Sequence, residues 1–306
     1  RAAAPRPDAG HEVTELLSRV DAALYAAKSR GRNRYCLFDA ALNETLERGR
    51  DVERDLAGAL EAGAVTVWFQ PIFRGDGRTV ESFEALLRWR HPRHGLIPPP
   101  DIVATAAASG LSDTLLRYIL ERVCTMLRTL RELGLDDVPV AMNVSPRELS
   151  QLAIDDIVLE TLAAYGLPPA LLEIEITEET MLDLRIAKAP LAALSAAGVR
   201  VALDDFGVGY SSLAALRQMR VDRIKIDRCF VSCIATSTND QVMVQAILQI
   251  GRSLGMDVVA EGVETAADLG VLQSLGCPGL QGYHLGRPMS LQEVARWVGA
   301  PRVGQG

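Results

Sequence analysis

Short apolar runs alternate with helical patterns along most of the chain. Between residues 65 and 282, runs rich in β-branched and aliphatic residues are separated by segments whose apolar residues recur at helical spacing. Eight predicted strands that alternate mostly with helices favour an α/β fold, the (β/α)8 barrel, over its main competitor, a doubly wound open sheet. The predicted strands are residues 65–72, 82–89, 138–144, 171–177, 199–205, 222–227, 256–261 and 279–282, and the predicted helices include 116–133, 154–165, 186–197, 241–254 and 266–275.

The first 62 residues follow a different pattern. Residues 12–31 carry apolar side chains at helical spacing up to Gly31, a natural helix C-cap, and a short predicted strand follows at residues 34–38. These elements are too small to fold alone, and helical residues from 40 to 62 then lead to the first barrel strand. We expect residues 1–45 to be the end of a neighbouring domain plus a linker, cut from a longer protein. Residues 46–300 would form the barrel domain and residues 301–306 a tail.

Composition narrows the class of protein. The 306 residues include 32 basic and 39 acidic side chains, so the formal net charge is −7 at pH 7. A protein that coats a nucleic-acid polymer needs a basic face to replace phosphate counterions, and this acidity argues against that class. No stretch approaches the roughly 18 apolar residues of a membrane span, and the N-terminus has no secretory signal. We expect a cytoplasmic chain, whose parent protein could still be attached to a membrane through other parts.

The cysteines give no sign of a zinc site or of a disulfide framework. They are odd in number, widely spread and contain no CxxC pair. Cys229 and Cys233 could meet on one helical turn, but buried free thiols are the interpretation that we favour. The five are Cys36, Cys124, Cys229, Cys233 and Cys277.

Polar side chains lie at or near the ends of the predicted strands, where barrel enzymes place their chemistry. Six of the eight strands deliver an acid or an amide oxygen, and one delivers a lysine. Buried carboxylates repel one another and are costly to desolvate unless cations neutralise them, which points to a divalent metal site. Oxygen ligands without His or Cys favour Mg²⁺ or Mn²⁺ over zinc. These residues are Glu84, Asn143, Glu175, Asp204, Asp205, Lys225, Glu261 and Gln281.

Two adjacent aspartates suggest a second ion. Successive side chains of a strand point to opposite faces, so Asp204 and Asp205 reach one site only where the strand breaks into a loop. We expect the break at residues 206–209, which contain two glycines. Such a pair could flank two metal ions about 3.5–4 Å apart, as in enzymes that cleave phosphate esters.

Simpler explanations exist for each feature alone. Asp-Asp before Phe-Gly is common in solvated turns. Lys225 and Asp227 could be only an ion pair, and Glu173, on the same strand face as Glu175, could be structural. These explanations treat each residue separately. They do not explain why polar residues occur at the ends of so many successive strands.

At these residues the chain resembles the EAL family of cyclic-di-GMP phosphodiesterases. The resemblance runs from about residue 52 to residue 298 and covers most of the chain. Its motifs are Phe69-Gln70-Pro71, Glu84-Ala85-Leu86-Leu87-Arg88-Trp89, Asn143-Val144-Ser145-Pro146, Glu175-Ile176-Thr177-Glu178, Asp204-Asp205-Phe206-Gly207, Lys225-Ile226-Asp227, Ala260-Glu261-Gly262-Val263-Glu264 and Gln281-Gly282-Tyr283.

The resemblance implies a fold and a pair of metal ions. The fold is a TIM-like (β/α)8 barrel with an antiparallel first strand. The cofactors are Mg²⁺ or Mn²⁺, with two ions expected. The implied ligands of the first ion are Glu84, Asn143, Glu175 and Asp204. Those of the second include Asp204 and Asp205, with Glu261 and Gln281 in or near its water shell.

The resemblance also implies roles around the ions. Lys225 would orient or deprotonate the attacking water, and Glu178 would hold the loop after Asp205, coupling it to a homodimer as in some members. Together with Glu261 these are the candidate catalytic residues. The candidate substrate-binding residues are Gln70, Arg88, Asp227 and Gln281, and the charge of Arg88 suits a phosphate.

Two further comparisons bear on the parent protein and its regulation. Residues 20–33 resemble the C-terminal end of a GGDEF (diguanylate cyclase) domain, whose missing part we expect in the parent chain. The chain departs from many EAL members at Ala107-Ala108, where two glutamates are common, and at Val208, where a small hydroxyl residue is common. Neither departure falls on an implied metal ligand, so both bear on regulation or dimer contacts.

The expected function is metal-dependent hydrolysis of cyclic-di-GMP to linear 5'-pGpG. One alternative is a catalytically inactive cyclic-di-GMP receptor, which would usually lack a metal ligand. Another is a Schiff-base aldolase with Lys225 as the nucleophile, which would work in EDTA. Two divalent ions, Arg88 and Lys225 would offset the overall acidity where the dianionic substrate binds.

Overall fold

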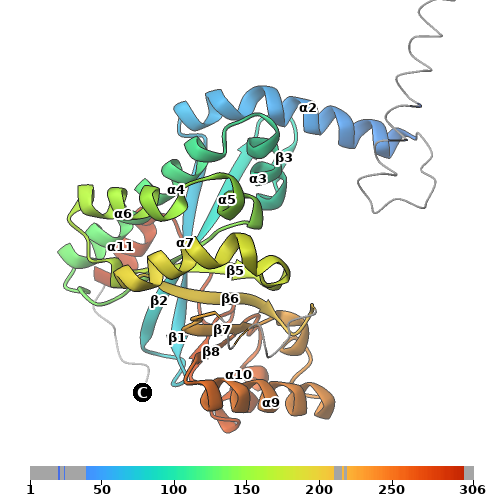
Figure 1. Ribbon diagram of the computed structural model, residues 1–306. Coiled ribbons are helices and arrows are strands. Elements are labelled where there is room, and N and C mark those ends of the chain that lie inside the picture. Colours follow the sequence, from blue (N-terminus) through green and yellow to red (C-terminus); the bar gives the residue numbers. More distant parts are fainter. Residues whose placement is uncertain (1–19, 21–23, 25–38, 210–215, 217–218, 300–306) are drawn as a thin grey trace, which may run out of the picture.

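Eight strands close into a barrel, and one short strand extends it at an edge (Figure 1). The computed structural model describes residues 39–209, 216 and 219–299, together with the isolated residues 20 and 24. The strands run in the order β1-β9-β8-β7-β6-β5-β4-β2-β3, and the pairing of β1 with β2 closes the sheet. They are β1 (Val65–Arg74), β2 (Val80–His91), β3 (Gly95–Ile97), β4 (Val140–Asn143), β5 (Leu172–Thr177), β6 (Arg200–Phe206), β7 (Arg223–Ile226), β8 (Asp257–Ala260) and β9 (Gly279–Leu280). The barrel is confirmed, and the open-sheet alternative is wrong.

The first strand runs against its two neighbours. A five-residue turn joins β1 directly to β2, and the Asp76 carboxylate fixes it by accepting the backbone N–H groups of Arg78 and Thr79, both at 2.8 Å. Gly77 lies in this turn with φ 65°. Without a crossover helix the chain must reverse, so β1 is antiparallel to β2 and also to β9, whereas β4 to β9 pair in parallel. The predicted antiparallel first strand is confirmed.

The helices surround this barrel and bury their apolar faces against it. Each helix predicted within the described residues is present, with boundaries that differ by at most four residues, whereas the short helices α3, α5 and α11 were not predicted. Helix α2 lies with α3 and β3 at one end of the molecule (Figure 1). The helices are α2 (Ala40–Glu61), α3 (Pro99–Ala108), α4 (Ser112–Glu132), α5 (Pro146–Gln151), α6 (Ile154–Tyr165), α7 (Leu184–Ala197), α9 (Thr238–Leu254), α10 (Ala266–Ser274) and α11 (Leu291–Gly299), with short 3-10 turns η1 (Pro169–Leu171), η2 (Glu178–Asp183) and η3 (Arg228–Phe230).

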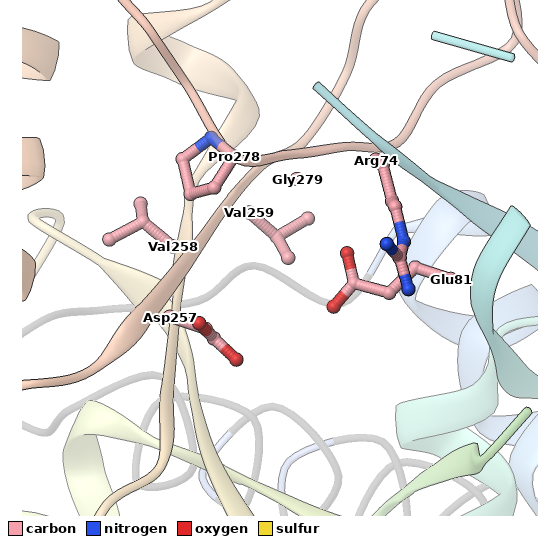
Figure 2. A pocket seen from close by; sticks show the side chains of 7 residues that line it. All are labelled: Arg74, Glu81, Asp257, Val258, Val259, Pro278 and Gly279. Atoms are coloured by element: carbon pink, nitrogen blue, oxygen red, sulfur yellow. The ribbon is translucent and has the colours of Figure 1, made fainter. Parts of the chain in front are cut away.

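Buried ion pairs fill the end of the barrel where most strands begin. Glu173 of β5 forms ion pairs with Arg223 Nη1 at 3.5 Å and with Arg200 Nη2 at 3.4 Å, and Arg223 also pairs with Glu81 of β2. Glu173 therefore has a structural role, as one of the simpler explanations proposed. A cavity of about 220 Å³ lies beside these pairs (Figure 2), lined by Arg74, Glu81, Asp257, Val258, Val259, Pro278 and Gly279.

Several predictions fall outside the described residues. They are the helix at 12–31, the strand at 34–38 and the tail at 301–306, so the GGDEF resemblance and the domain boundaries at 45 and 300 stay predictions. Within the described part of the chain, every helix is too short or too polar to cross a membrane.

Candidate active site

The predicted site residues gather at the opposite end of the barrel from the buried ion pairs. Asn143 ends β4, whereas Glu261 and Gln281 come one residue after β8 and β9. Glu84 lies inside β2, as it does in the predicted strand 82–89, and not at the end of the strand. β2 continues seven residues beyond it, to His91, since β1 and β3 pair with its extension.

Lys225 is the centre of the site. Its side chain is fully buried, and Nζ contacts four carboxylate oxygens that come from four different strands or strand ends. The distances from Nζ are 2.7 Å to Glu261 Oε1, 2.9 Å to Glu175 Oε1, 3.3 Å to Glu84 Oε2 and 3.4 Å to Asp204 Oδ1. The parallel strands thus bring together residues that are up to 177 positions apart, because the ends of all of them meet at one rim.

Two amides tie the carboxylates to one another. Asn143 Nδ2 donates to Glu84 Oε1 and to Glu175 Oε2, both at 3.1 Å. Gln281 Nε2 donates to Glu84 Oε2 at 2.7 Å. The carbonyl oxygen Oε1 of Gln281 is buried and has no hydrogen-bond partner among the described residues. A buried free acceptor of this kind suits a cation or a water that a cation holds.

The positive charge of Lys225 does not neutralise the carboxylates around it, and the pKa values of the cluster show this. Burial and the adjacent Glu84 carboxylate raise the pKa of Glu175 well above its usual value, and burial raises the pKa of Glu261 to about 8. Burial lowers the pKa of Lys225, but Asp204 and the other carboxylates outweigh it and hold this pKa well above its usual value. Lys225 is therefore charged, and the cluster lacks positive charge.

Asp205 adds to a set of oxygens that are close enough together to hold a metal ion. Oxygen atoms of Asp204, Asp205 and Glu261 all lie within 4.8 Å of one another. Five carboxylates, those of Glu84, Glu175, Asp204, Asp205 and Glu261, face one ammonium group, so the fully ionised cluster carries −4 and two divalent cations would neutralise it. Hard oxygen donors of this number fit Mg²⁺ or Mn²⁺.

The chain turns sharply at Asp205 itself. Among the described non-glycine residues it is the one with positive φ, 55°, and the register of β6 against β7 breaks between Leu203 and Phe206. The strand ends at Phe206 and a loop follows at residues 207–209, as predicted, but the chain already departs from regular strand geometry at Asp205. The left-handed conformation is tolerated because aspartate adopts it more readily than most residues, and it lets two adjacent carboxylates serve one site.

Glu178 contacts the segment that follows Asp205 and holds it in place. Its Oε1 accepts the backbone N–H of Gly207 at 2.9 Å, and a Cβ added to Gly209 would clash with its carboxylate. Phe230 supports the same segment from η3, since a Cβ on Gly207 would lie 2.7 Å from its ring. Phe230 was not predicted from the sequence, although the glycine at position 207 was a sign that another group packs closely there.

The predicted substrate contacts lie around the cluster and not within it. Gln70 is opposite Glu84 in the β1–β2 register and donates to the Gly286 carbonyl at 3.1 Å. Arg88 is four residues beyond Glu84 on the same face of β2, and its guanidinium donates to the Leu87 carbonyl at 2.9 Å. The Asp227 carboxylate accepts Cys229 N–H at 2.8 Å and, after burial and the Asp204 charge, contributes to the raised pKa of Asp205. The suggested ion pair of Asp227 with Lys225 is wrong.

Divalent ions should raise the melting temperature more at pH 8 than at pH 5. Burial raises the pKa of Asp205 from 3.8 to about 6 and that of Glu261 from 4.5 to about 8. The folded metal-free protein therefore binds these protons more tightly than the unfolded chain, so the stability that they contribute is full below about pH 4 and is lost as the pH rises towards 8. Bound cations would replace the lost protons. Melting curves in EDTA and in Mg²⁺ at matched ionic strength would check this, and an equal Mg²⁺ effect at both pH values would contradict it.

Known proteins resemble this chain in sequence and in structure. The family model described as EAL domain matches residues 53–288. The bifunctional diguanylate cyclase/cyclic di-GMP phosphodiesterase MucR of Pseudomonas aeruginosa is 38% identical over 289 residues, which are 94% of this chain and 42% of MucR. The cyclic di-GMP phosphodiesterase NbdA of the same organism is 36% identical over 297 residues, 97% of this chain and 38% of NbdA. The chain thus spans less than half the length of these curated relatives.

A solved structure supports the same grouping. The PaMucR phosphodiesterase in complex with c-di-GMP superposes with a TM-score of 0.75 at 37% identity, covering 80% of this chain and 99% of that one. The family match spans the strands that carry the carboxylate cluster. On this evidence the chain belongs to the EAL domain family.

Proposed function

We propose that the chain hydrolyses one phosphodiester bond of cyclic-di-GMP and releases linear 5'-pGpG, with two divalent ions at the barrel mouth. The observation that carries the proposal is the complete set of oxygen donors around Lys225. Relatives that carry the name phosphodiesterase, and a neighbouring structure in complex with c-di-GMP, support the choice of substrate.

The donors divide between two metal positions. Glu84, Asn143, Glu175 and Asp204 would hold one ion, and Asp204 and Asp205 would hold the other, with Glu261 and Gln281 close by. Bound ions of this kind supply Lewis acidity and a water of lowered pKa. Asp204 would be shared by the two ions and Asp205 would bind only the second. Both side chains would reach the site because the chain turns at Asp205.

The chain's own side chains position the reactants. The Nζ atom of Lys225 lies at the centre of the donors, and we assign it to orienting or deprotonating the attacking water. Glu178 keeps the segment after Asp205 in place through Gly207 N–H. Gln70 and Arg88 would contact the substrate, and the guanidinium of Arg88 is suited to a phosphate.

Two alternative functions are less well supported. A receptor that only binds cyclic-di-GMP would usually lack a metal ligand, and every predicted ligand is present. An aldolase needs a neutral lysine to attack a carbonyl, whereas Lys225 is charged and lies among four carboxylates. A homodimer, a cytoplasmic location and an upstream GGDEF segment remain predictions of this proposal.

The proposal is tested by incubating the purified chain with cyclic-di-GMP and Mg²⁺ or Mn²⁺, followed by chromatography. We expect pGpG to form, EDTA to stop the reaction and added metal to restore it. Intact cyclic-di-GMP under both metals, with binding retained, would overturn hydrolysis in favour of the receptor. Activity in EDTA with borohydride trapping at Lys225 would instead support the aldolase.

A further inference from the structure

An exposed tryptophan lies beside the carboxylate cluster. Trp68 of β1 is 36% exposed, and no aromatic ring among the described residues packs on it. Trp297 of α11 is equally exposed, but its indole packs edge-on against the rings of Phe73 and Phe83. The third tryptophan, Trp89, is buried. Trp68 is therefore the one of the three that combines an exposed ring with the lack of an aromatic neighbour in the described part of the chain.

The register of β1 against β2 places Trp68 on the face that carries the cluster. Gln70 is opposite Glu84, and Trp68 is opposite Leu86, with no irregularity in this stretch of the pairing. Side chains two residues apart on a strand point to the same side of the sheet. Trp68 is thus one step of about 7 Å along the strand from the pair formed by Gln70 and Glu84.

This face is open beyond Glu84 because β1 and β2 continue past the neighbouring strand. β4 pairs with β2 only as far as Ala85, whereas β1 stays paired with β2 beyond that point. Along the same face Glu84 is buried and Leu86 is half-buried. Arg88 is half-buried as well, and Arg90 is exposed. The face of the cluster therefore continues outward as an open wall, and Trp68 lies at the start of it.

The chemistry of this wall suits a nucleotide. Cross-strand partners such as Trp68 and Leu86 have Cβ atoms about 5 Å apart, so an aromatic and an aliphatic side chain lie together next to the cluster. Arg88 and Arg90 add positive charge further out. Aromatic side chains hold bases by stacking, and guanidinium groups suit phosphate oxygens. A dinucleotide with one phosphodiester bond at the cluster has a base within reach of a ring one step away.

We propose that Trp68 stacks on one guanine base of cyclic-di-GMP and so holds the dinucleotide with its phosphodiester bond over the carboxylate cluster. The inference rests on the proposed function, which it extends from the reacting phosphate to a base. Leu86, the cross-strand partner of Trp68, flanks the base. The indole contacts the base and not the bond that breaks, so the stack is equally strong in the bound substrate and in the transition state.

Tryptophan fluorescence tests the stack without hydrolysis. The probe is pGpG in Mg²⁺, which carries both bases and is already linear. An indole that stacks on guanine loses emission, so pGpG should quench the wild-type chain in a saturable way, and Trp68→Phe should lose this quenching. Trp297→Phe is the matched control, because Trp297 is equally exposed but packs on other rings, and it should keep the quenching. An unquenched wild type, or quenching that persists in Trp68→Phe, would overturn the stack.

Calorimetry with the same probe measures how much the ring contributes to binding. Trp68→Ala should weaken pGpG binding by about 5- to 150-fold, the range for one stacked base, whereas Trp68→Phe should retain most of the affinity because phenylalanine also stacks. Leu96→Ala removes an exposed apolar side chain of β3, further from the cluster, and should leave binding unchanged. Wild-type affinity in Trp68→Ala would overturn the inference.

Kinetics separates this inference from the proposed function. If hydrolysis is observed, Trp68→Ala should raise the KM for cyclic-di-GMP by a much larger factor than it lowers kcat, the pattern of an interaction that substrate and transition state share. An unchanged KM would overturn the stack and leave hydrolysis standing. Quenching that depends on Trp68, without hydrolysis under either metal, would support the stack and overturn the proposed function.

Discussion

Glu175→Gln should lower the turnover of cyclic-di-GMP by more than about 100-fold, beyond the loss typical of residues that only support a metal ligand. Its carboxylate is fully buried, contacts Lys225 Nζ at 2.9 Å and accepts Asn143 Nδ2 at 3.1 Å. The amide keeps the size of the side chain but removes the charge that an ion needs. Steady-state rates in saturating Mg²⁺, with circular dichroism to confirm folding, would measure the effect.

Glu173→Gln is the matched control. Glu173 lies two residues earlier on the same face of β5 and is equally buried, but it pairs with Arg200 and Arg223 at the other end of the barrel. Its loss should cost about 1–3 kcal/mol of unfolding free energy, because the buried guanidinium of Arg223 and the partly exposed guanidinium of Arg200 lose an ionised partner. Turnover should stay near the wild-type rate. Similar losses of turnover in both variants would show that burial of charge, and not metal binding, explains the first result.

Lys225→Met should abolish turnover and should also destabilise the metal-free protein by about 3–5 kcal/mol, the usual effect of removing one partner from a buried ionic cluster. Methionine fills a similar volume, so the lost charge is the main change. Glu84, Glu175, Asp204 and Glu261 would then face one another without a counter-charge. Urea denaturation at pH 8 in EDTA measures the deficit.

Mg²⁺ provides the control for this variant. If the carboxylates bind divalent ions, Mg²⁺ should recover most of the lost stability of Lys225→Met while turnover stays low. The same deficit with and without Mg²⁺ would mean that the ions do not occupy the cluster. A variant that turns over substrate at the wild-type rate would remove Lys225 from the chemistry.

The strands were predictable because each one is a short apolar run. The polar site residues were predictable because they lie at or near the ends of those runs. The sequence did not predict β3, which has three residues and depends on pairing with β2 beyond the barrel. The antiparallel first strand was inferred from resemblance, although Asp76-Gly77 is a turn signal that could have indicated the reversal.

Features that depend on one backbone angle or one side-chain contact were not predictable from periodicity. The break at Asp205 arises from a single positive φ at a non-glycine residue, which no pattern of apolar residues encodes. Cys229 and Cys233 are exposed, so the expectation of buried thiols is wrong for this pair, and their exposure follows from which face of a short turn meets the barrel. Side-chain hydrogen bonds, such as the one that Gly207 N–H donates to Glu178, join elements that are distant in sequence. Only the closed barrel defines how such elements lie in space.

The central claim is that the carboxylate cluster holds two divalent ions, and anomalous diffraction from crystals grown with Mn²⁺ and pGpG would test it most directly. We predict two manganese peaks about 3.5–4 Å apart. One would lie among Glu84, Asn143, Glu175 and Asp204, and the other beside Asp204 and Asp205. Crystals with fully bound pGpG and no manganese peak among these oxygens would contradict the account.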